Sequence, residues 1–477
     1  MIPSRLFARR LFAAFVAFAA GCTTVGPDYV PPTTAVPAAF RDVGQGGLDS
    51  GAADLRDWWR KLDDTVLDQL VARAIGDGLD LRAAMMRVDE ARALRGEAVA
   101  DRWPTVDARA GYQRVGQSEN TPLGGFAENF DQYTTGVNLS WEVDLWGRVR
   151  RSIEAADADV GQRLAAARDV AVAIAAETAT NYVEFRSLQQ RLQIARDNQT
   201  LQEQTLALVQ ARFEAGLVGE RDVAQATSIL AATRARIPSL AISLRAAENR
   251  LAVLVGQAPG ALAQDLAAVA PVPAPPANVA VGVPTDAVRQ RPDVRAAERA
   301  LAAETARIGV AEGDLYPRLS LLGTVGFESD KIANQFDGAS NVFAIGPSLT
   351  WNLFDAGRLR SRVEAQEARA QQALLAWQQT VLLALEQSEN AMTAFAREQT
   401  RRDELGNAAT QARRAVDLAQ AQYREGLTDF QNVLDSERAL VELEDQQAQS
   451  RAAVTQNLIL LYRALGGGFD GAAAGQP

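Results

Sequence analysis

The chain has 477 residues, with 49 basic and 59 acidic side chains, a single cysteine and no histidine. Without histidine there is no imidazole base or metal ligand, and one cysteine supplies neither a disulfide nor a thiolate metal cage. No catalytic, metal or cofactor site is therefore predicted. A formal charge of −10 disfavours nucleic acid as a partner, because neutralising phosphates needs a basic surface.

The first residues have the pattern of an export signal. Three arginines precede an apolar run, residues 11–20, which is too short to span a membrane and has the length of a secretory apolar region. The run ends directly before Gly21 and Cys22, as in bacterial lipoproteins, although Ala19 stands where leucine is usual. The alternative is a plain signal peptide with a cysteine nearby by chance. We predict that residues 1–21 are removed and that Cys22 carries a covalent lipid.

The rest of the chain is a duplicated unit. A shift of 210 positions aligns five pairs that mark the repeat: Gly136 and Gly346, Trp141 and Trp351, Gly147 and Gly357, Gly216 and Gly426, Gly256 and Gly466. Upstream the shift is 213, so the first copy carries three extra residues in a loop around Asn120–Gly125. The predicted divisions are an N-terminal segment 22–62, repeat 63–260, a Pro/Ala-rich extended connector 261–284, repeat 285–468 and a tail 469–477.

Each copy has the same predicted order of helix, strand hairpin, long helix and return helix. The first helix covers residues 65–100 with a break at 76–78, and its counterpart covers residues 285–312 without one. The hairpins are expected at about 103–145 and 316–354, with strands near the ~10 residues that a tilted transmembrane strand needs.

The second strand of each hairpin alternates between apolar and polar residues. One face of the first holds Tyr133, Thr135, Val137, Leu139, Trp141, Val143 and Leu145, and the other holds Thr134, Gly136, Asn138, Ser140, Glu142 and Asp144. Soluble hairpins packed on helices are the alternative, but aromatic residues near both strand ends are typical of the interfacial girdles of a membrane barrel. The residues predicted to face lipid are Trp103, Tyr133, Val137, Leu139, Trp141, Tyr316 and Trp351.

A very long helix follows each hairpin. Residues 357–424 contain no proline and have apolar residues at spacings of three, four or seven, which predicts a narrow packing stripe. At ~1.5 Å per residue this helix extends about 100 Å, too far for one globular domain. It ends near Gly426, and a return helix runs from residue 429 to 465. The predicted tips are Gly216, Leu217 and Val218 in the first copy and Gly426, Leu427 and Thr428 in the second.

Five motifs in this order resemble those of the outer membrane efflux protein (TolC-like) family. They are Gly26-Pro27-Asp28-Tyr29, Trp58-Trp59, the run from Ser140 to Arg148, Arg291-Pro292-Asp293, and Tyr423-x-x-Gly426. The match is closest to the lipoprotein branch that serves resistance-nodulation-division (RND) pumps. The resemblance implies a mainly α fold with a membrane β-barrel, formed as a homotrimer with a 12-stranded barrel and a long helical periplasmic tunnel.

The resemblance implies an outer-membrane exit duct in a Gram-negative bacterium. It would conduct small molecules from an inner-membrane pump and a periplasmic adaptor, with the tips as docking sites and Asp435 and Arg438 at the periplasmic aperture. The predicted strands agree with a barrel formed by several chains. Four strands leave open edges, which lipid does not tolerate, so several chains must close the barrel together. Two other hypotheses stay open at this point: a structural coiled-coil lipoprotein without a lumen, and a carboxylate enzyme such as a glycosidase.

Overall fold

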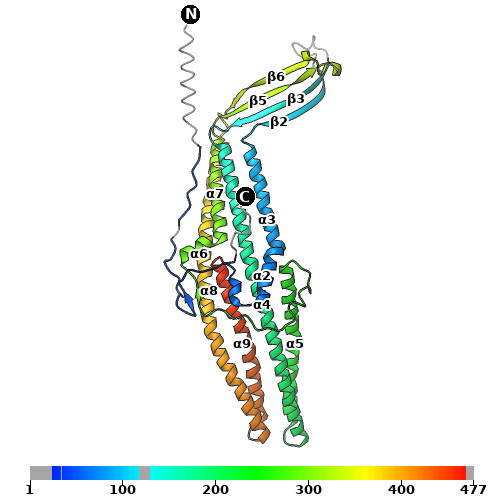
Figure 1. The fold of residues 1–477 in the computed structure, drawn as a ribbon, viewed down its shortest axis with the longest axis vertical. Helices are drawn as coiled ribbons and strands as arrows, with labels where there is room; N and C mark the ends of the chain where they lie inside the picture. Colours follow the sequence, from blue (N-terminus) through cyan, green and yellow to red (C-terminus); the bar gives the residue numbers. More distant parts are fainter. Residues whose placement is uncertain (1–23, 34, 117, 119–128, 469–477) are drawn as a thin grey trace. The chain divides into compact units, whose positions relative to one another are not determined.

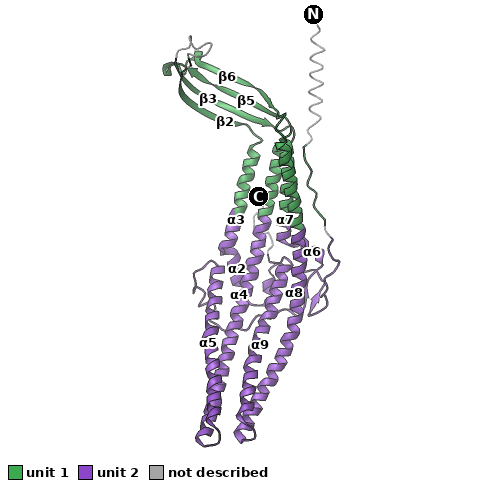
Figure 2. Ribbon diagram, turned by 180° about the vertical axis from the view of Figure 1, so that it is seen from behind, with its two compact units in different colours: residues 1–33, 87–163, 296–377 green, residues 34–86, 164–295, 378–477 purple. Residues whose placement is uncertain are grey.

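The computed structural model describes residues 24–33, 35–116, 118 and 129–468 and contains two compact units (Figure 2). The first unit comprises residues 1–33, 87–163 and 296–377, and the second comprises residues 34–86, 164–295 and 378–477. The predicted signal peptide, Cys22, the loop from Asn120 to Gly125 and the tail from residue 469 lie outside the described residues. No helix within the described ranges is long and apolar enough to cross a membrane.

The first unit contains a four-stranded antiparallel sheet in the order β2-β3-β5-β6 (Figure 1). Its strands are β2 (Thr105–Val115), β3 (Phe130–Val143), β5 (Arg318–Ser329) and β6 (Asn341–Thr350). Strands β3 and β5 come from different copies of the duplicated unit, and they pair along 11 residues. The two hairpins therefore form one sheet, whose edges are β2 and β6.

The strands end earlier than the alternation predicted. β3 stops at Val143 and β6 at Thr350, so Leu145 and Trp351 lie beyond the strands. The reason is that the next residues start the long helices. The Asp144 carboxylate accepts the backbone N–H of Val149 at 3.1 Å and that of Arg150 at 3.0 Å, which satisfies donors in the first turn of α4.

The helices of each copy follow the predicted order. They are α2 (Thr65–Asp77), α3 (Leu79–Ala100), α4 (Arg148–Glu214) and α5 (Glu220–Leu254) in the first copy, and α6 (Pro284–Gln290), α7 (Pro292–Gly313), α8 (Arg358–Glu425) and α9 (Phe430–Ala464) in the second. The break between α2 and α3 lies at Gly78, within the predicted interruption. The prediction of one continuous helix over 285–312 was wrong. Arg291 is extended, with ψ 125°, because the ring of Pro292 disfavours helical backbone at the residue before it.

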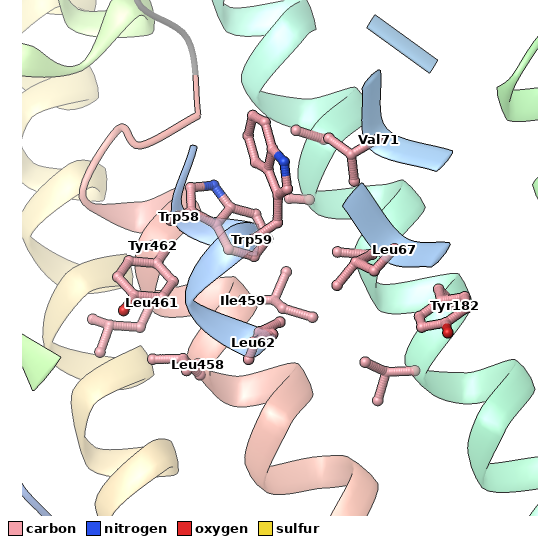
Figure 3. Packing of buried hydrophobic residues seen from close by; sticks show 14 of the residues in the cluster. Trp58, Trp59, Leu62, Leu67, Val71, Tyr182, Leu458, Ile459, Leu461 and Tyr462 are labelled. Carbon is pink, nitrogen blue, oxygen red and sulfur yellow. The ribbon is translucent and has the colours of Figure 1, made fainter. Parts of the chain in front are cut away.

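The main core lies in the second unit and includes segments that were predicted to be extended connections. In the N-terminal segment, a short 3₁₀ helix, η1 (Trp58–Leu62), places Trp58 against Tyr462 with ring centroids 5.3 Å apart (Figure 3). The two-residue strands β1 (Leu48–Asp49) and β4 (Val279–Ala280) pair in parallel. Val279 and Val281 are each 1% exposed, so this part of the Pro/Ala-rich connector belongs to the core, contrary to the prediction.

The backbone repeats the duplication seen in the sequence. Glycines related by the 210-residue shift share a left-handed backbone with nearly equal φ: 81° and 86° at Gly147 and Gly357, 73° and 76° at Gly216 and Gly426, 74° and 82° at Gly256 and Gly466. These positions begin the long helices, end them, and end the return helices. The repeated sequence therefore encodes the same three left-handed backbone positions twice.

Candidate functional site

The register of the sheet places one apolar face across all four strands. Residues paired directly across antiparallel strands share a face. Val137 pairs with Ala108 and Val325, and Leu139 pairs with Val106 and Gly323. This apolar face is exposed in the single chain: Val106 by 61%, Val137 by 44%, Val325 by 60%, Phe343 by 76% and Ile345 by 75%. Contiguous exposed apolar surface of this kind marks contact with a membrane or a partner.

The opposite face is polar near the middle of the sheet. Asn138 pairs with Asp107 on one side and with Thr324 on the other. The Thr324 hydroxyl donates to Asn138 Oδ1 at 3.0 Å. The alternation predicted on β3 therefore continues across the neighbouring strands, and the assignment of the apolar face to lipid remains a prediction.

Aromatic side chains lie at both ends of the sheet. At the end next to the helices, Trp141 Nε1 donates to the carbonyl of Arg102 at 2.9 Å, and Trp351 Nε1 donates to that of Leu315 at 3.1 Å. Trp103 and Tyr316 lie just before β2 and β5 and are 71% and 40% exposed. At the far end, Tyr112 and Tyr133 pack with ring centroids 5.0 Å apart.

The spacing of these two aromatic groups fits a membrane. Tyr133 and Trp141 are eight residues apart on β3, which corresponds to about 27 Å along the strand at ~3.4 Å per residue, or roughly 19–22 Å of membrane depth at a strand tilt of about 35–45°. The apolar band of a transmembrane barrel is about 25 Å tall. Between the two aromatic groups, the strands carry the aliphatic residues of the apolar face.

The two helical hairpins end in matching turns. Gly216 N–H donates to the carbonyl of Phe213 at 2.8 Å and Leu217 N–H to that of Arg212 at 2.9 Å. At the second tip, Gly426 N–H donates to Tyr423 O at 3.0 Å and Leu427 N–H to Gln422 O at 2.9 Å. This is the Schellman pattern, in which a left-handed residue, usually glycine, ends the helix. Leu217 and Leu427 are 65% and 72% exposed, so each tip carries an exposed apolar side chain.

The predicted Asp435 and Arg438 pair lies on α9, just after the second tip. Arg438 Nη1 is 3.7 Å from Asp435 Oδ1, and the two side chains are 55% and 60% exposed. Gln431 Nε2 also donates to Asp435 Oδ1, at 2.9 Å. An exposed pair of this kind adds little stability by itself. Its charges are therefore free to contact another chain, and its place at an aperture remains a prediction.

A contact that the sequence did not predict joins the two hairpins near their tips. The Arg212 guanidinium of α4 lies over the ring of Tyr423 on α8, 4.6 Å from its centroid, and donates to the Tyr423 carbonyl. Around them is a small apolar cluster of Val209, Ala226, Ala419, Tyr423, Phe430, Val433 and Leu434. The Tyr-x-x-Gly motif thus supplies both the helix end and the ring that carries this contact.

Two polar layers, each with a buried residue at its centre, lie further along the same helices. In the first, Thr205 Oγ1 of α4 and Gln420 Nε2 of α8 donate to Glu437 Oε1 of α9, at 2.6 and 3.0 Å. In the second, Asn198 Nδ2 donates to Glu444 Oε2 at 3.0 Å, and Arg413 forms an ion pair with Glu444. All three helices advance by seven residues from one layer to the next, which is two helical turns. The sequence signal for these layers is a pair of polar residues seven positions apart in each helix, at 198 and 205, 413 and 420, and 437 and 444.

Glu437 is the most isolated carboxyl group of these layers. It is 1% exposed, and its Oε2 has no hydrogen-bond partner among the described residues. Burial raises the pKa of Glu437, and the hydrogen bonds from Thr205 and Gln420 oppose the rise. The protonation state of this group is therefore coupled to the packing of α9 on α4 and α8.

This fold, with two strand hairpins in one sheet and two long helical hairpins, is that of outer-membrane channel proteins. The model of the outer membrane efflux protein family matches residues 70–257 and 283–467, and the chain belongs to this family. The matched ranges cover both copies of the duplicated unit.

Relatives match over almost their whole length. Nodulation protein T of Rhizobium leguminosarum bv. trifolii is 31% identical over 465 residues, which are 97% of this chain and 98% of the relative. Outer membrane protein OprJ of Pseudomonas aeruginosa is 31% identical over 473 residues, 96% of this chain and 95% of that protein. Among solved structures, the outer-membrane channel OprN is 38% identical, with a TM-score of 0.86 over 93% of this chain and 99% of OprN. The chain is thus a component of the outer membrane, and it belongs to a family of efflux channels.

Proposed function

We propose that three copies of this chain form the exit duct of a tripartite efflux system. The observation that carries the proposal is the single sheet of four strands, with an exposed apolar face and two open edges at β2 and β6. Open edges are not tolerated in lipid, so copies must close the sheet into a barrel. Two copies would give eight strands and a filled interior, whereas three give twelve strands and room for a channel.

The partners follow from the exposed tips of the two helical hairpins. The exposed leucines at the tips, Leu217 and Leu427, are proposed to dock a periplasmic adaptor. An inner-membrane pump, of the RND type in the branch that the motifs resemble, would supply the energy. The chain itself would conduct passively. OprJ and OprN support this proposal as similar outer-membrane proteins.

Planar-bilayer recording of the purified protein tests the proposal. Stable single-channel currents are expected, whereas a structural coiled-coil lipoprotein would give none. Replacing Asp435 and Arg438 together by alanine is expected to raise conductance and to admit large antibiotics into cells. The reason is that only a closed channel would hold these side chains in contact across the aperture. Glu442→Ala, an exposed change on the same helix, is the matched control. Unchanged conductance and antibiotic exclusion in the double variant would place the aperture elsewhere.

Docking at the tips is tested at Gly426. Gly426→Arg should abolish efflux for two reasons. It puts a bulky charge on the tip, and it places a residue with a long side chain at a left-handed backbone position, φ 76°, that glycine adopts readily. Gly426→Asn is the control, since asparagine tolerates this backbone and adds no charge. Drug susceptibility of cells and co-purification of the adaptor are the measurements. Equal efflux by the Arg and Asn variants would argue against docking here, and Gly216 permits the same comparison.

The lipid anchor on Cys22 is a further part of the proposal. Mass spectrometry of the mature protein is expected to show an acylated Cys22 at the N-terminus and no residues 1–21. An unmodified N-terminus or a retained leader would exclude it. Because a membrane sheet also holds the protein in lipid, Cys22→Ser should slow assembly more than it weakens final attachment.

A further inference from the structure

The connection between β5 and β6 is a compact segment, residues 330–340, with a buried glutamine at its centre. Two short 3₁₀ helices, η3 (Ile332–Asn334) and η4 (Gly338–Ser340), flank Gln335, which is 3% exposed. Backbone hydrogen bonds close the segment on itself, including Asp337 N–H to Asn334 O at 3.1 Å and Ser340 N–H to Asp337 O at 2.9 Å. It has a defined conformation despite its position at the end of a hairpin.

Gln335 fixes this segment to one face of the sheet. Its Nε2 donates to Thr135 Oγ1 at 2.5 Å and to the Phe327 carbonyl at 3.0 Å, and its Oε1 accepts from Ser329 Oγ at 2.7 Å. Thr135 and Phe327 are directly paired, and both lie on the face that carries Val137 and Val325. The segment is therefore folded onto the apolar face and away from the polar face.

The outer surface of the segment continues the apolar face. Phe336 packs edge-on against Phe327, with ring centroids 5.6 Å apart, yet 74% of Phe336 is exposed. Ile332 is 67% exposed. Asp330, Lys331 and Asp337 are also exposed, so apolar and charged side chains are mixed in one short element. Such a mixture suits the boundary between acyl chains and headgroups.

We propose that residues 330–340 form a membrane-interface element, with Ile332 and Phe336 inserted at the acyl-headgroup boundary of the outer leaflet. The inference rests on the proposed function, because it takes the sheet to span the outer membrane with its helix-linked end toward the periplasm. The ligand is the lipid surface itself. The segment extends the outer aromatic girdle of Tyr112 and Tyr133. Because it lies on the apolar face, it does not cover the mouth of the lumen beside β5 and β6.

Site-directed spin labelling in vesicles of lipopolysaccharide and phospholipid tests the proposal. Single labels are placed at Phe336→Cys, at Val325→Cys on the apolar face, and at Val342→Cys, which pairs with Gly326 on the opposite face. The unsubstituted protein, treated with the same reagent, gives the background from any Cys22 thiol that carries no lipid. Labels at positions 336 and 325 are expected to collide several-fold more with oxygen than with a water-soluble nickel complex, and the label at 342 to show the reverse.

The outcomes separate the two levels of inference. If the label at 325 is in lipid but the label at 336 is in water, the membrane-interface element is wrong and the channel proposal stands. If both are in water, the face assignment and the proposed function fail together. In the Gln335→Ala background, the label at 336 should lose its preference for oxygen while bilayer conductance stays unchanged. An unaltered preference would overturn the role of Gln335.

Discussion

Arginine in place of Leu139 is expected to prevent assembly in the outer membrane, whereas arginine in place of Asn138 is expected to permit it. Leu139 lies near the middle of β3 on the apolar face. A charge there costs about 2–4 kcal/mol at the bilayer midplane, and three chains would bear it together. Asn138 lies on the polar face, where an added charge mainly changes the lumen.

The neighbours of the two residues explain the difference. Leu139 is flanked by Val106 and Gly323, which offer an arginine no counter-ion. Asn138 is flanked by Asp107 and Thr324, so an arginine there gains a carboxylate in the adjacent register position. The measurements are the amount of trimer in outer-membrane fractions and single-channel conductance. Equal assembly defects in the two variants would contradict the assignment of the two faces.

Periodicity allowed the sequence to predict the regular elements. The two-residue alternation of β3 required a sheet with unlike faces, and a glycine between two apolar helical stripes required a tip at Gly216 and Gly426. Both signals are local, because they depend on backbone geometry that each short segment sets for itself. The structure contains both.

Contacts between residues far apart in the sequence could not be predicted in the same way. Nothing near Gln335 in the sequence indicates that it meets Thr135, 200 residues away along the chain. Val279 and Val281 are in a Pro/Ala-rich stretch, and only pairing with β1 gives them a place in the core. The break before Pro292 is different, because the restriction that proline places on the backbone of Arg291 is a local signal in the sequence.

The buried carboxyl group of Glu437 leads to a prediction about pH. Its pKa is raised by burial, so the folded packing favours the protonated group. The stabilising effect is complete below the ordinary pKa of glutamate and is lost as the pH rises through the raised value. A rise in pH from the ordinary pKa of glutamate through the raised value should therefore loosen α9 from Thr205 on α4 and from Gln420 on α8. Because α9 also carries Asp435, loosening it should increase the open probability of the channel.

Two substitutions at Glu437 separate protonation from packing. Glu437→Gln keeps the acceptor at Oε1 and removes the charge, so it should abolish both the decline in thermal stability and the rise in open probability as the pH increases. Glu437→Ala leaves the donors of Thr205 and Gln420 without this acceptor and should cost about 1–3 kcal/mol at every pH. Glu442→Gln, an exposed change on the same helix, should alter neither. A wild-type pH profile in Glu437→Gln would mean that another group controls the response.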